Sequence, residues 1–223
     1  MFERIKYLFV KKVYADHNDS VRVRRALQKI FLSLPKDFKG LNIGAGKTRL
    51  HSNISNLEIE PGEGIDLVGS VLSIPCANDS FDIVISQEVL EHVNKPDEAI
   101  CEMYRVLKKG GVLYLQLPFI IGYHPCPHDY WRFSHEGIYE LVSRVSFEII
   151  ESDITVGPAS GFYRVLVEFF AVLASIIWQG FYKPIKFLTA LIFYPVKWLD
   201  PLLMKSDENK RIAGGFYIVC RKL

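Results

Sequence analysis

Short apolar runs alternate with helical patterns through much of the chain, and this alternation limits the fold more than any other feature. The runs are GLNIG, SNLEI, IDLVG, FDIVIS and VLYLQLP, which start between residues 40 and 112. A helical pattern fills residues 96–108, with Asp97 and Glu98 in its first turn and Lys108, Lys109 and Gly110 closing it. Strands that alternate with helices predict an α/β fold built on a parallel sheet.

The flanking segments complete the predicted organisation. Val23, Leu27 and Ile30 recur at helical spacing after Ser20, a candidate N-cap, and a second helix is expected to begin at Ser134. FEIIESDITV and GGFYIVCRK have the composition of strands. We therefore expect an N-terminal helical segment (1–35), an α/β core (36–156), an apolar helical insertion (157–210) and a final core strand (211–223).

A glycine turn follows the first apolar run. Gly44, Ala45 and Gly46 would let a ligand approach the backbone closely and leave amide groups free to bind it. The string GAGKT resembles the end of a phosphate-binding P-loop, but that motif needs a glycine five positions before Gly46, where this chain has Leu41. No apolar run ends in an aspartate that would hold magnesium, so the P-loop interpretation is set aside.

Polar residues follow the next two runs, where the carboxyl ends of parallel strands would share one crevice. Glu58 ends the second run, and its carboxylate could accept hydrogen bonds from both hydroxyls of a ribose. Ser70 and Val71 follow the third run, where a side-chain acceptor and a backbone amide could meet the edge of an adenine. Ile59 and Leu72 would then flank the faces of that ring.

Four longer strings carry a resemblance to a known family. They are LNIGAG, NLEIEPGEGIDLVGSVLSIP, NDSFDIVISQEVLEHV and PDEAICEMYRVLKKGGVLYLQLP. With them, residues 38–150 resemble the class I methyltransferases of the small type 11 group, which use S-adenosylmethionine. The resemblance implies a Rossmann-like, doubly wound sheet of seven strands with the last one antiparallel. The residues it assigns to the cofactor are Asn42, Gly44, Ala45, Gly46, Glu58, Ile59, Ser70, Val71, Leu72 and Gln87.

Two positions depart from the pattern of this family. Asn42 stands where the family usually has an acidic residue, and Ser70 stands where an aspartate normally meets the adenine. Each change removes a negative charge near a cationic ligand, so we expect weaker cofactor binding. The leading interpretation is a methyltransferase that acts on an oxygen of a small or lipid-linked acceptor. The alternative is a non-catalytic binding or assembly module with a vestigial pocket.

The segment after the fifth run is dense in histidine and aromatic residues and is expected to be a long loop that meets the acceptor. Its string HDYWRFS resembles the DYWRFT segment of the same family. Methyl transfer to oxygen requires a base to remove the proton of the acceptor, so His124, His128 and Asp129 are the candidate catalytic residues. Tyr130 and Arg132 are the candidates for holding the acceptor.

Two further histidine groups have a structural and a chemical interpretation. We expect Glu91 and His92, in the string LEHV, to hold the loop after the fourth strand by hydrogen bonds. His124, Cys126 and His128 have side chains that bind zinc, but the intervening prolines and the lack of a second ligand pair argue against a site. The sequence therefore predicts no metal.

Charge and cysteine content restrict the partners and the compartment. Lys and Arg number 27 against 25 Asp and Glu, a balance too even to indicate a nucleic-acid partner, and none is expected. The cysteines Cys76, Cys101, Cys126 and Cys220 are scattered, which is typical of a protein in reducing cytosol.

The apolar insertion is the part that exceeds a minimal domain. Residues 165–178 and 185–199 are apolar, but both are too short or too interrupted by charge to cross a bilayer. Two short helices with lysines at their margins, Lys183, Lys186, Lys197 and Lys205, would suit peripheral contact with an anionic membrane at its inner face. Phe2, Ile5 and Phe9 at the amino terminus could join them. The alternative is packing on the domain or against a second copy in a homodimer.

Overall fold

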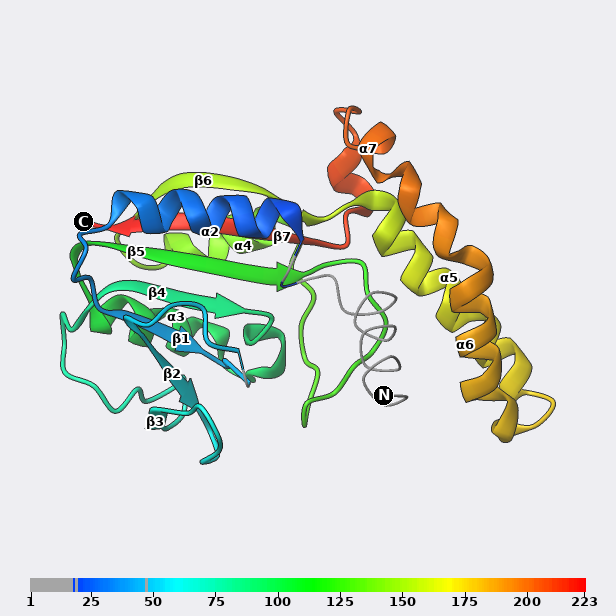
Figure 1. Cartoon of the computed structure of the whole chain (residues 1–223), viewed down its shortest axis with the longest axis horizontal. Coiled ribbons are helices and arrows are strands. Elements are labelled where there is room, and N and C mark those ends of the chain that lie inside the picture. Colours follow the sequence, from blue (N-terminus) through cyan, green and yellow to red (C-terminus); the bar gives the residue numbers. More distant parts are fainter. Residues whose placement is uncertain (1–17, 19, 47) are drawn as a thin grey trace. The chain divides into compact units, whose positions relative to one another are not determined.

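The computed structural model describes residues 18, 20–46 and 48–223, and their strands form one seven-stranded sheet in the order β3-β2-β1-β4-β5-β7-β6 (Figure 1). The strands are β1 Gly40–Ile43, β2 Ile54–Glu58, β3 Leu67–Val68, β4 Phe81–Gln87, β5 Leu107–Pro118, β6 Phe147–Val156 and β7 Gly215–Lys222. The first five strands pair in parallel, and β7 runs antiparallel. The predicted fold class is therefore confirmed.

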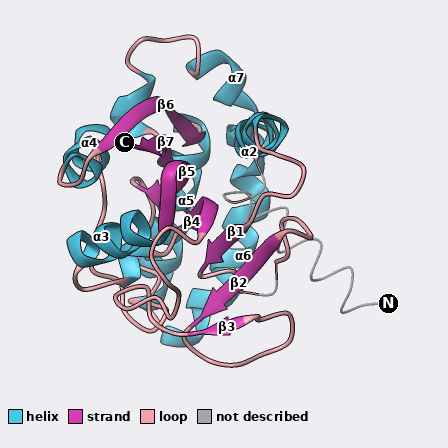
Figure 2. Ribbon diagram, turned by 90° about the vertical axis from the view of Figure 1, so that its left-hand side faces the viewer, coloured by secondary structure: helices cyan, strands magenta, loops and turns pink. Residues whose placement is uncertain are grey.

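Helices cover both faces of the sheet. Figure 2 shows α3 (Pro96–Val106) and α4 (His135–Ser143) on one face and α2 (Val21–Ser33) on the other. The predicted N-cap of α2 is present, because the hydroxyl of Ser20 accepts from the Val23 amide. Ser134, where the second helix was expected to begin, is the N-cap of α4, and its hydroxyl accepts from the Gly137 amide. β4 lies inside the sheet between β1 and β5, and most of its residues are buried, as expected of a central parallel strand.

The predicted end of α3 is wrong by two residues. The helix ends at Val106, and Lys108, Lys109 and Gly110 belong to β5. The register between β4 and β5 shifts between Phe81 and Ile83, and Gly110 takes a φ of +79° within this irregular stretch. Lys108 pairs with a carboxylate of β4 instead of ending the helix. Local charge order indicated a helix terminus, but pairing with the neighbouring strand determined the conformation.

The described residues divide into two compact units. One contains residues 25–118, 124–153 and 216–223, which hold most of the sheet, and the other contains residues 119–123 and 154–215 together with the start of α2. The second unit holds α5 (Pro158–Ser175), η2 (Gln179–Phe181), α6 (Tyr182–Phe193), η3 (Tyr194–Leu199), α7 (Asp200–Leu203) and η4 (Asn209–Ile212).

Helices α5 and α6 form a hairpin with a small core of its own. Tyr163, Val167 and Ala190 are buried there, and the hydroxyl of Tyr163 donates to the carbonyl oxygen of Ala190. Asp200 accepts hydrogen bonds from the backbone amide of Ala159, which lies in the first turn of α5, so it acts as an N-cap from a distant part of the chain. Packing within the second unit therefore orients the two helices.

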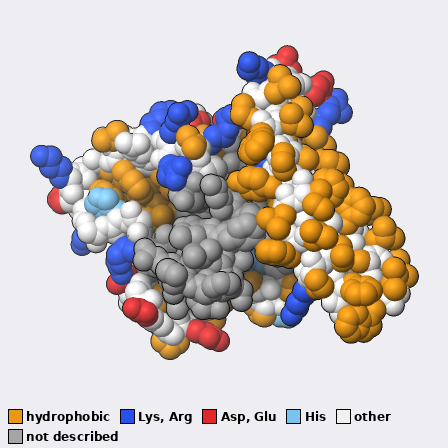
Figure 3. Space-filling model, turned by 45° about the vertical axis from the view of Figure 1, so that its right-hand side comes forward, with side chains coloured by type: hydrophobic (Ala, Val, Ile, Leu, Met, Phe, Trp, Pro, Cys, Tyr) orange, Lys and Arg blue, Asp and Glu red, His pale blue; other side chains and the backbone are white. Residues whose placement is uncertain are grey.

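One face of this hairpin is rich in apolar side chains, as Figure 3 shows. The exposed large apolar residues of the hairpin and its connection include Phe169, Val172, Leu173, Ile176, Ile177, Trp178, Leu188 and Ile192. Trp198 in η3 and Leu202 in α7 are exposed as well. None of the described helices is long and apolar enough to span a bilayer. The predicted contribution of Phe2, Ile5 and Phe9 lies outside the described residues.

Candidate functional site

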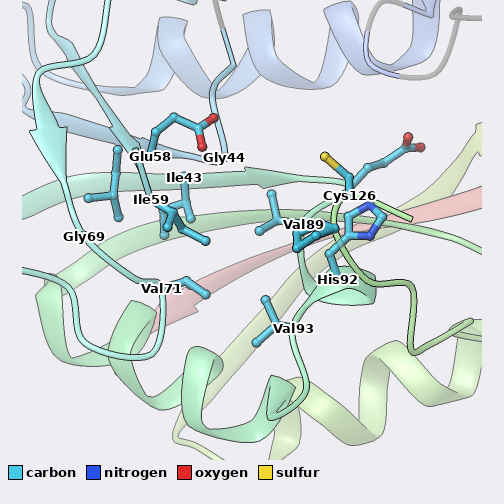
Figure 4. Close-up of a pocket in the computed structure, with 13 residues that line it drawn as sticks. Ile43, Gly44, Glu58, Ile59, Gly69, Val71, Val89, His92, Val93 and Cys126 are labelled. Carbon is cyan, nitrogen blue, oxygen red and sulfur yellow. The ribbon is translucent and has the colours of Figure 1, made fainter. Parts of the chain in front are cut away.

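A cavity opens at the carboxyl ends of β1, β2 and β4, within the unit that holds most of the sheet. Figure 4 shows Gly44 and Glu58 at one end and His92 and Cys126 at the other, with aliphatic side chains between them. The lining residues are Ile43, Gly44, Leu57, Glu58, Ile59, Gly69, Val71, Glu88, Val89, His92, Val93, Cys126 and Pro127. This is the crevice in which open α/β sheets bind their ligands.

Backbone conformation and space both demand glycine at the first position of the turn. Gly44 has a φ of +64°, and a Cβ added there would lie 2.3 Å from Cγ2 of Val89. Its amide donates to the carbonyl oxygen of Leu57 at 3.0 Å, which ties the turn to β2. Gly46 also has a positive φ, of +55°, but an added Cβ would meet nothing within 4 Å. The turn is therefore held by packing at its start and is open at its end.

The glycine turn and the acid that ends β2 meet at the cavity. The Gly46 amide donates to Oε1 of Glu58 at 2.5 Å. Glu58 is half-buried and lines the cavity, while Ile59 beside it is exposed and Val71 opposite is buried. The structure thus places the Glu58 carboxylate, the glycine turn and the side chains of Ile59 and Val71 around one cavity. The spacing of these residues in the sequence predicts this arrangement.

Some predicted cofactor residues lie beside the cavity rather than in its lining. Asn42 is buried in β1, and its Nδ2 donates to Oδ1 of Asn56 at 3.3 Å. The hydroxyl of Ser70 accepts from the Leu72 amide at 3.1 Å, which closes a local turn. The side chains of Asn42 and Ser70 are thus engaged by the protein itself.

Ala45 and Gln87 are also outside the lining. Ala45 is buried inside the glycine turn. Gln87, the last residue of β4, donates from Nε2 to Oε1 of Gln116 on β5 at 3.2 Å. These two residues support the elements that border the cavity.

Glu88 lines the cavity and was not singled out from the sequence. It has a φ of +54°, a conformation that a residue with a side chain rarely adopts outside functional sites. Burial, and secondly the charge of Glu91, raises the pKa of Glu88 to about 8. At neutral pH this carboxyl is mainly protonated and can donate a hydrogen bond. Its place directly after a buried strand was the signal that could have identified it.

Glu91 and His92 form the 3-10 turn η1 (Leu90–His92) that follows β4. The Glu91 side chain is completely buried, and its Oε1 lies 3.7 Å from Nε2 of His92. The backbone oxygen of Glu91 accepts from the amides of Tyr130 and Trp131, at 2.7 and 3.2 Å. The loop is therefore held to this turn by the backbone oxygen of Glu91 and by Nδ1 of His92, which lies 2.5 Å from the backbone oxygen of His128.

The loop at residues 119–134 brings three predicted residues together. Asp129 accepts from both terminal nitrogens of Arg132 and from the backbone amide of His124 at 2.8 Å. These contacts, the Arg132 pair first, hold the pKa of Asp129 well below its usual range. Nδ1 of His124 lies 3.2 Å from Nη2 of Arg132 and 3.5 Å from Oδ2 of Asp129. His124 is thus oriented by a charged pair.

Two other predicted residues are turned elsewhere. The His128 side chain is exposed and lies against the Tyr130 ring, while its backbone oxygen is 2.5 Å from Nδ1 of His92. Tyr130 is 48% exposed. Of the two candidate histidine bases, only His124 lies close to the buried carboxylates of Glu91 and Asp129.

Comparison with known proteins relates part of the unit that holds most of the sheet to a known family. Residues 41–115 match the family model described as a methyltransferase domain. This stretch, about a third of the chain, is similar to methyltransferase domains. Methyltransferases of this family bind S-adenosylmethionine.

Curated relatives of the methyltransferase domain match over short stretches. A Mycobacterium tuberculosis protein described as an uncharacterized methyltransferase is 39% identical over 59 residues, which is 26% of this chain and 23% of the relative. A ubiquinone/menaquinone biosynthesis C-methyltransferase from Ruegeria sp. is 29% identical over 84 residues, covering 38% of this chain and 29% of the relative. The chain therefore matches less than a third of the length of these relatives.

Solved structures share the fold of the domain at low identity. Phosphoethanolamine N-methyltransferase 2 of Haemonchus contortus, in complex with phosphomonomethylethanolamine and S-adenosylhomocysteine, has a TM-score of 0.55 and is 13% identical, with 96% of this chain and 56% of that one covered. The [4+2]-cyclase SpnF has a TM-score of 0.55 and is 17% identical, with 90% and 81% covered. Because one fold carries both reactions, the activity must be argued from the site.

Proposed function

We propose that this protein binds S-adenosylmethionine in the cavity beside β1 and β2 and transfers its methyl group to an oxygen of a small or lipid-linked acceptor. The observation that supports the cofactor site is the contact between the Gly46 amide and Glu58 at the mouth of the cavity. It places a carboxylate beside a turn that a ligand can approach closely.

The residues present suit the proposed cofactor. The Glu58 carboxylate is an acceptor that can receive both hydroxyls of a ribose, and Ile59 and Val71 supply apolar walls for an adenine ring. A side chain at position 44 would push Val89 into this space, whereas glycine leaves it open. When bound, S-adenosylmethionine supplies a methyl group activated by a positively charged sulfur.

The remaining chemistry belongs to the acceptor loop. We assign His124 the role of taking the proton from the acceptor oxygen, because Asp129 and Arg132 orient its ring. Arg132 also holds Asp129 ionised, so that this carboxylate can stabilise a protonated imidazole. Tyr130, whose half-exposed ring lies against His128, is proposed to contact the acceptor.

Isothermal titration with S-adenosylmethionine and with S-adenosylhomocysteine tests the cofactor site. Glu58→Gln should weaken binding by about 10-fold or more, because a charged acceptor of two hydrogen bonds is lost. Glu60→Gln is the matched control, since Glu60 is an exposed acid two residues away, and it should bind like the wild type. Equal affinity of both variants and the wild type would reject the assignment of Glu58.

The same titration separates the enzyme from the binding module with a vestigial pocket. That alternative is favoured by the side chains of Asn42 and Ser70, which are engaged within the protein and carry no charge. If neither S-adenosylmethionine nor S-adenosylhomocysteine gives a heat of binding at millimolar concentration, the methyltransferase proposal is rejected. The non-catalytic binding module is then the remaining interpretation.

The apolar hairpin supports the lipid-linked class of acceptor. Ile176, Ile177 and Trp178, at the end of α5, are 77%, 81% and 63% exposed. Exposed lysines, Lys183 and Lys205, lie in the same segment. Apolar side chains flanked by cations suit the surface of an anionic membrane, so we assign this hairpin to the cytoplasmic face of the membrane.

Co-sedimentation with phosphatidylglycerol vesicles tests this membrane contact. At low salt, the wild-type protein should sediment with the vesicles, whereas the double variant Ile177→Glu/Trp178→Glu should stay in the supernatant. The control Leu32→Glu, at an exposed apolar residue of α2, should sediment like the wild type. Wild-type protein that stays in the supernatant and elutes as a dimer, with dimerisation lost in the double variant, would reject the membrane and indicate a homodimer through the insertion.

A further inference from the structure

A buried carboxylate in the methyltransferase domain has no hydrogen bond to any part of the chain that the structure describes. Glu91 is completely buried, and both of its side-chain oxygens lack a hydrogen-bond partner among those residues. Polar groups inside proteins are nearly always hydrogen-bonded, and a buried charge without compensation costs several kcal/mol. The side chain therefore faces a place where a positive partner is missing.

Two imidazoles converge on the same carboxylate. Oε1 of Glu91 lies 3.7 Å from Nε2 of His92 and 3.8 Å from Nε2 of His124. These separations are too long for hydrogen bonds, and the candidate ligand atoms of all three residues lie within 4.8 Å of one another. Ligand atoms about 2.1 Å from a shared ion lie roughly 3 to 3.6 Å apart, so a small contraction would bring all three into contact with one cation.

The outer nitrogens of the two imidazoles have different partners, and that of His92 is held as in a metal ligand. Nδ1 of His92 is 2.5 Å from the backbone oxygen of His128, which only accepts, so Nδ1 carries the proton and Nε2 presents a lone pair to Glu91. For His124, Nδ1 lies 3.2 Å from Nη2 of Arg132, which only donates, and 3.5 Å from Oδ2 of Asp129. Coordination through Nε2 therefore requires Nδ1 to exchange the contact with Arg132 for a hydrogen bond that it donates to Asp129. Carboxylates and carbonyl oxygens are the usual partners behind metal-binding histidines.

We propose that Glu91, His92 and His124 bind a divalent transition-metal ion. Two imidazoles and one carboxylate favour ions such as Zn²⁺ or Mn²⁺ over Mg²⁺ or Ca²⁺, which prefer sites made of oxygen. The side chains of His92 and His124 are 15% and 33% exposed, whereas the Glu91 oxygens between them are buried.

This proposal revises the sequence prediction of no metal and uses a different set of residues. The set suggested by spacing alone was His124, Cys126 and His128, but the side chains of Cys126 and His128 are exposed and do not belong to the converging group. Sequence spacing did not reveal the actual group, because His124 is remote in sequence from Glu91 and His92.

The site also bears on the acceptor, in a step that rests on the proposed methyl transfer. An ion with three protein ligands keeps open positions for a further ligand, and His92 lies in the wall of the cavity. Such an ion lowers the pKa of a bound hydroxyl, which favours acceptors with an alcohol or phenol oxygen. With the ion bound, His124 would be a ligand, and the ion rather than His124 would promote loss of the proton from the acceptor oxygen.

Metal titration tests the site without reference to activity. The full chain is stripped with a chelator, and ZnCl₂ or MnCl₂ is added in a calorimeter. One equivalent should bind, and Glu91→Gln, His92→Gln and His124→Gln should each weaken binding by about 10-fold or more. His128→Gln and His135→Gln remove histidines outside the group and should bind like the wild type.

A second measurement needs no substitution at Glu91, whose burial could couple it to folding. In protein with isotope-labelled histidine, substoichiometric Mn²⁺ should broaden the imidazole signals of His92 and His124 before those of His128 and His135. The proposal is overturned if neither metal binds at millimolar concentration, if the three ligand variants bind like the wild type, or if His128 is broadened first. Failure of cofactor binding in the titration of Glu58 would leave these results unchanged, so the two proposals fail separately.

Discussion

Replacing Gly44 by alanine tests how the glycine turn is built. The substitution adds a Cβ to a residue with a φ of +64°, and that atom would lie 2.3 Å from Cγ2 of Val89. Gly46 provides the matched control, since its φ of +55° imposes the same backbone penalty while an added Cβ meets nothing within 4 Å. Comparison of the two variants therefore separates backbone strain from packing.

The expected magnitudes follow from these two terms. A residue with a side chain in the left-handed region costs about 1 to 2 kcal/mol, so Gly46→Ala should lower the free energy of unfolding by that amount. Gly44→Ala carries the same cost and must also displace Val89, which adds about 1 to 3 kcal/mol as in other overpacked sites. Combining Gly44→Ala with Val89→Ala should recover most of the second term.

Urea unfolding provides the measurement. Trp131 is the tryptophan in the unit that holds most of the sheet, so its fluorescence in a Trp178→Phe/Trp198→Phe background reports on that unit. The reasoning is refuted if Gly44→Ala is no more destabilising than Gly46→Ala. It is equally refuted if Val89→Ala brings no recovery, because the contact with Val89 would then not carry the cost.

Two further predictions concern titrating residues and use the same unfolding assay with a chelator present. The pKa of Glu88 is raised from 4.5 to about 8, so the folded protein holds a proton that the unfolded chain releases, and stability should fall as pH rises between these values. Glu88→Gln should not show this fall in the free energy of unfolding, and above pH 8 it should be more stable than the wild type by roughly 5 kcal/mol at most. If the two proteins instead lose stability in parallel as pH rises, Glu88 is not responsible. The pKa of Asp129 is lowered from 3.8, so its pair with Arg132 stabilises the fold above that pH and is lost as pH falls through the lower folded-state pKa. Asp129→Asn should cost about 2 to 3 kcal/mol at pH 7 and less in acid, and an equal cost at every pH would show that the charge is not responsible.

Much of the fold could be predicted because its signals are local. The apolar runs and capping residues located every strand from β1 to β5 and the starts of α2 and α4, since side-chain periodicity and N-cap chemistry depend on neighbours in sequence. The end of α3 was wrong because the residues after Val106 pair with β4, a contact that local charge order does not encode.

The candidate site was predictable to a lesser degree. The cavity lining includes Gly44, Glu58 and Val71, which the motif spacing indicated, whereas Asn42 and Ser70 have their side chains engaged within the protein. Strand order places the ends of β1 and β2 together, but it does not say which way each side chain turns or what binds it.

The linear pattern of residues was enough for the α/β class, the glycine turn and the acid at the end of β2, because each depends on a few consecutive positions. Tertiary structure alone brought His124 to Glu91 and His92, buried the Glu91 carboxylate without a hydrogen bond, and gave Glu88 its raised pKa. The physical reason is that burial and the approach of charges depend on how the loop after β5 folds back onto the turn after β4, and residues distant in sequence meet only when that packing forms.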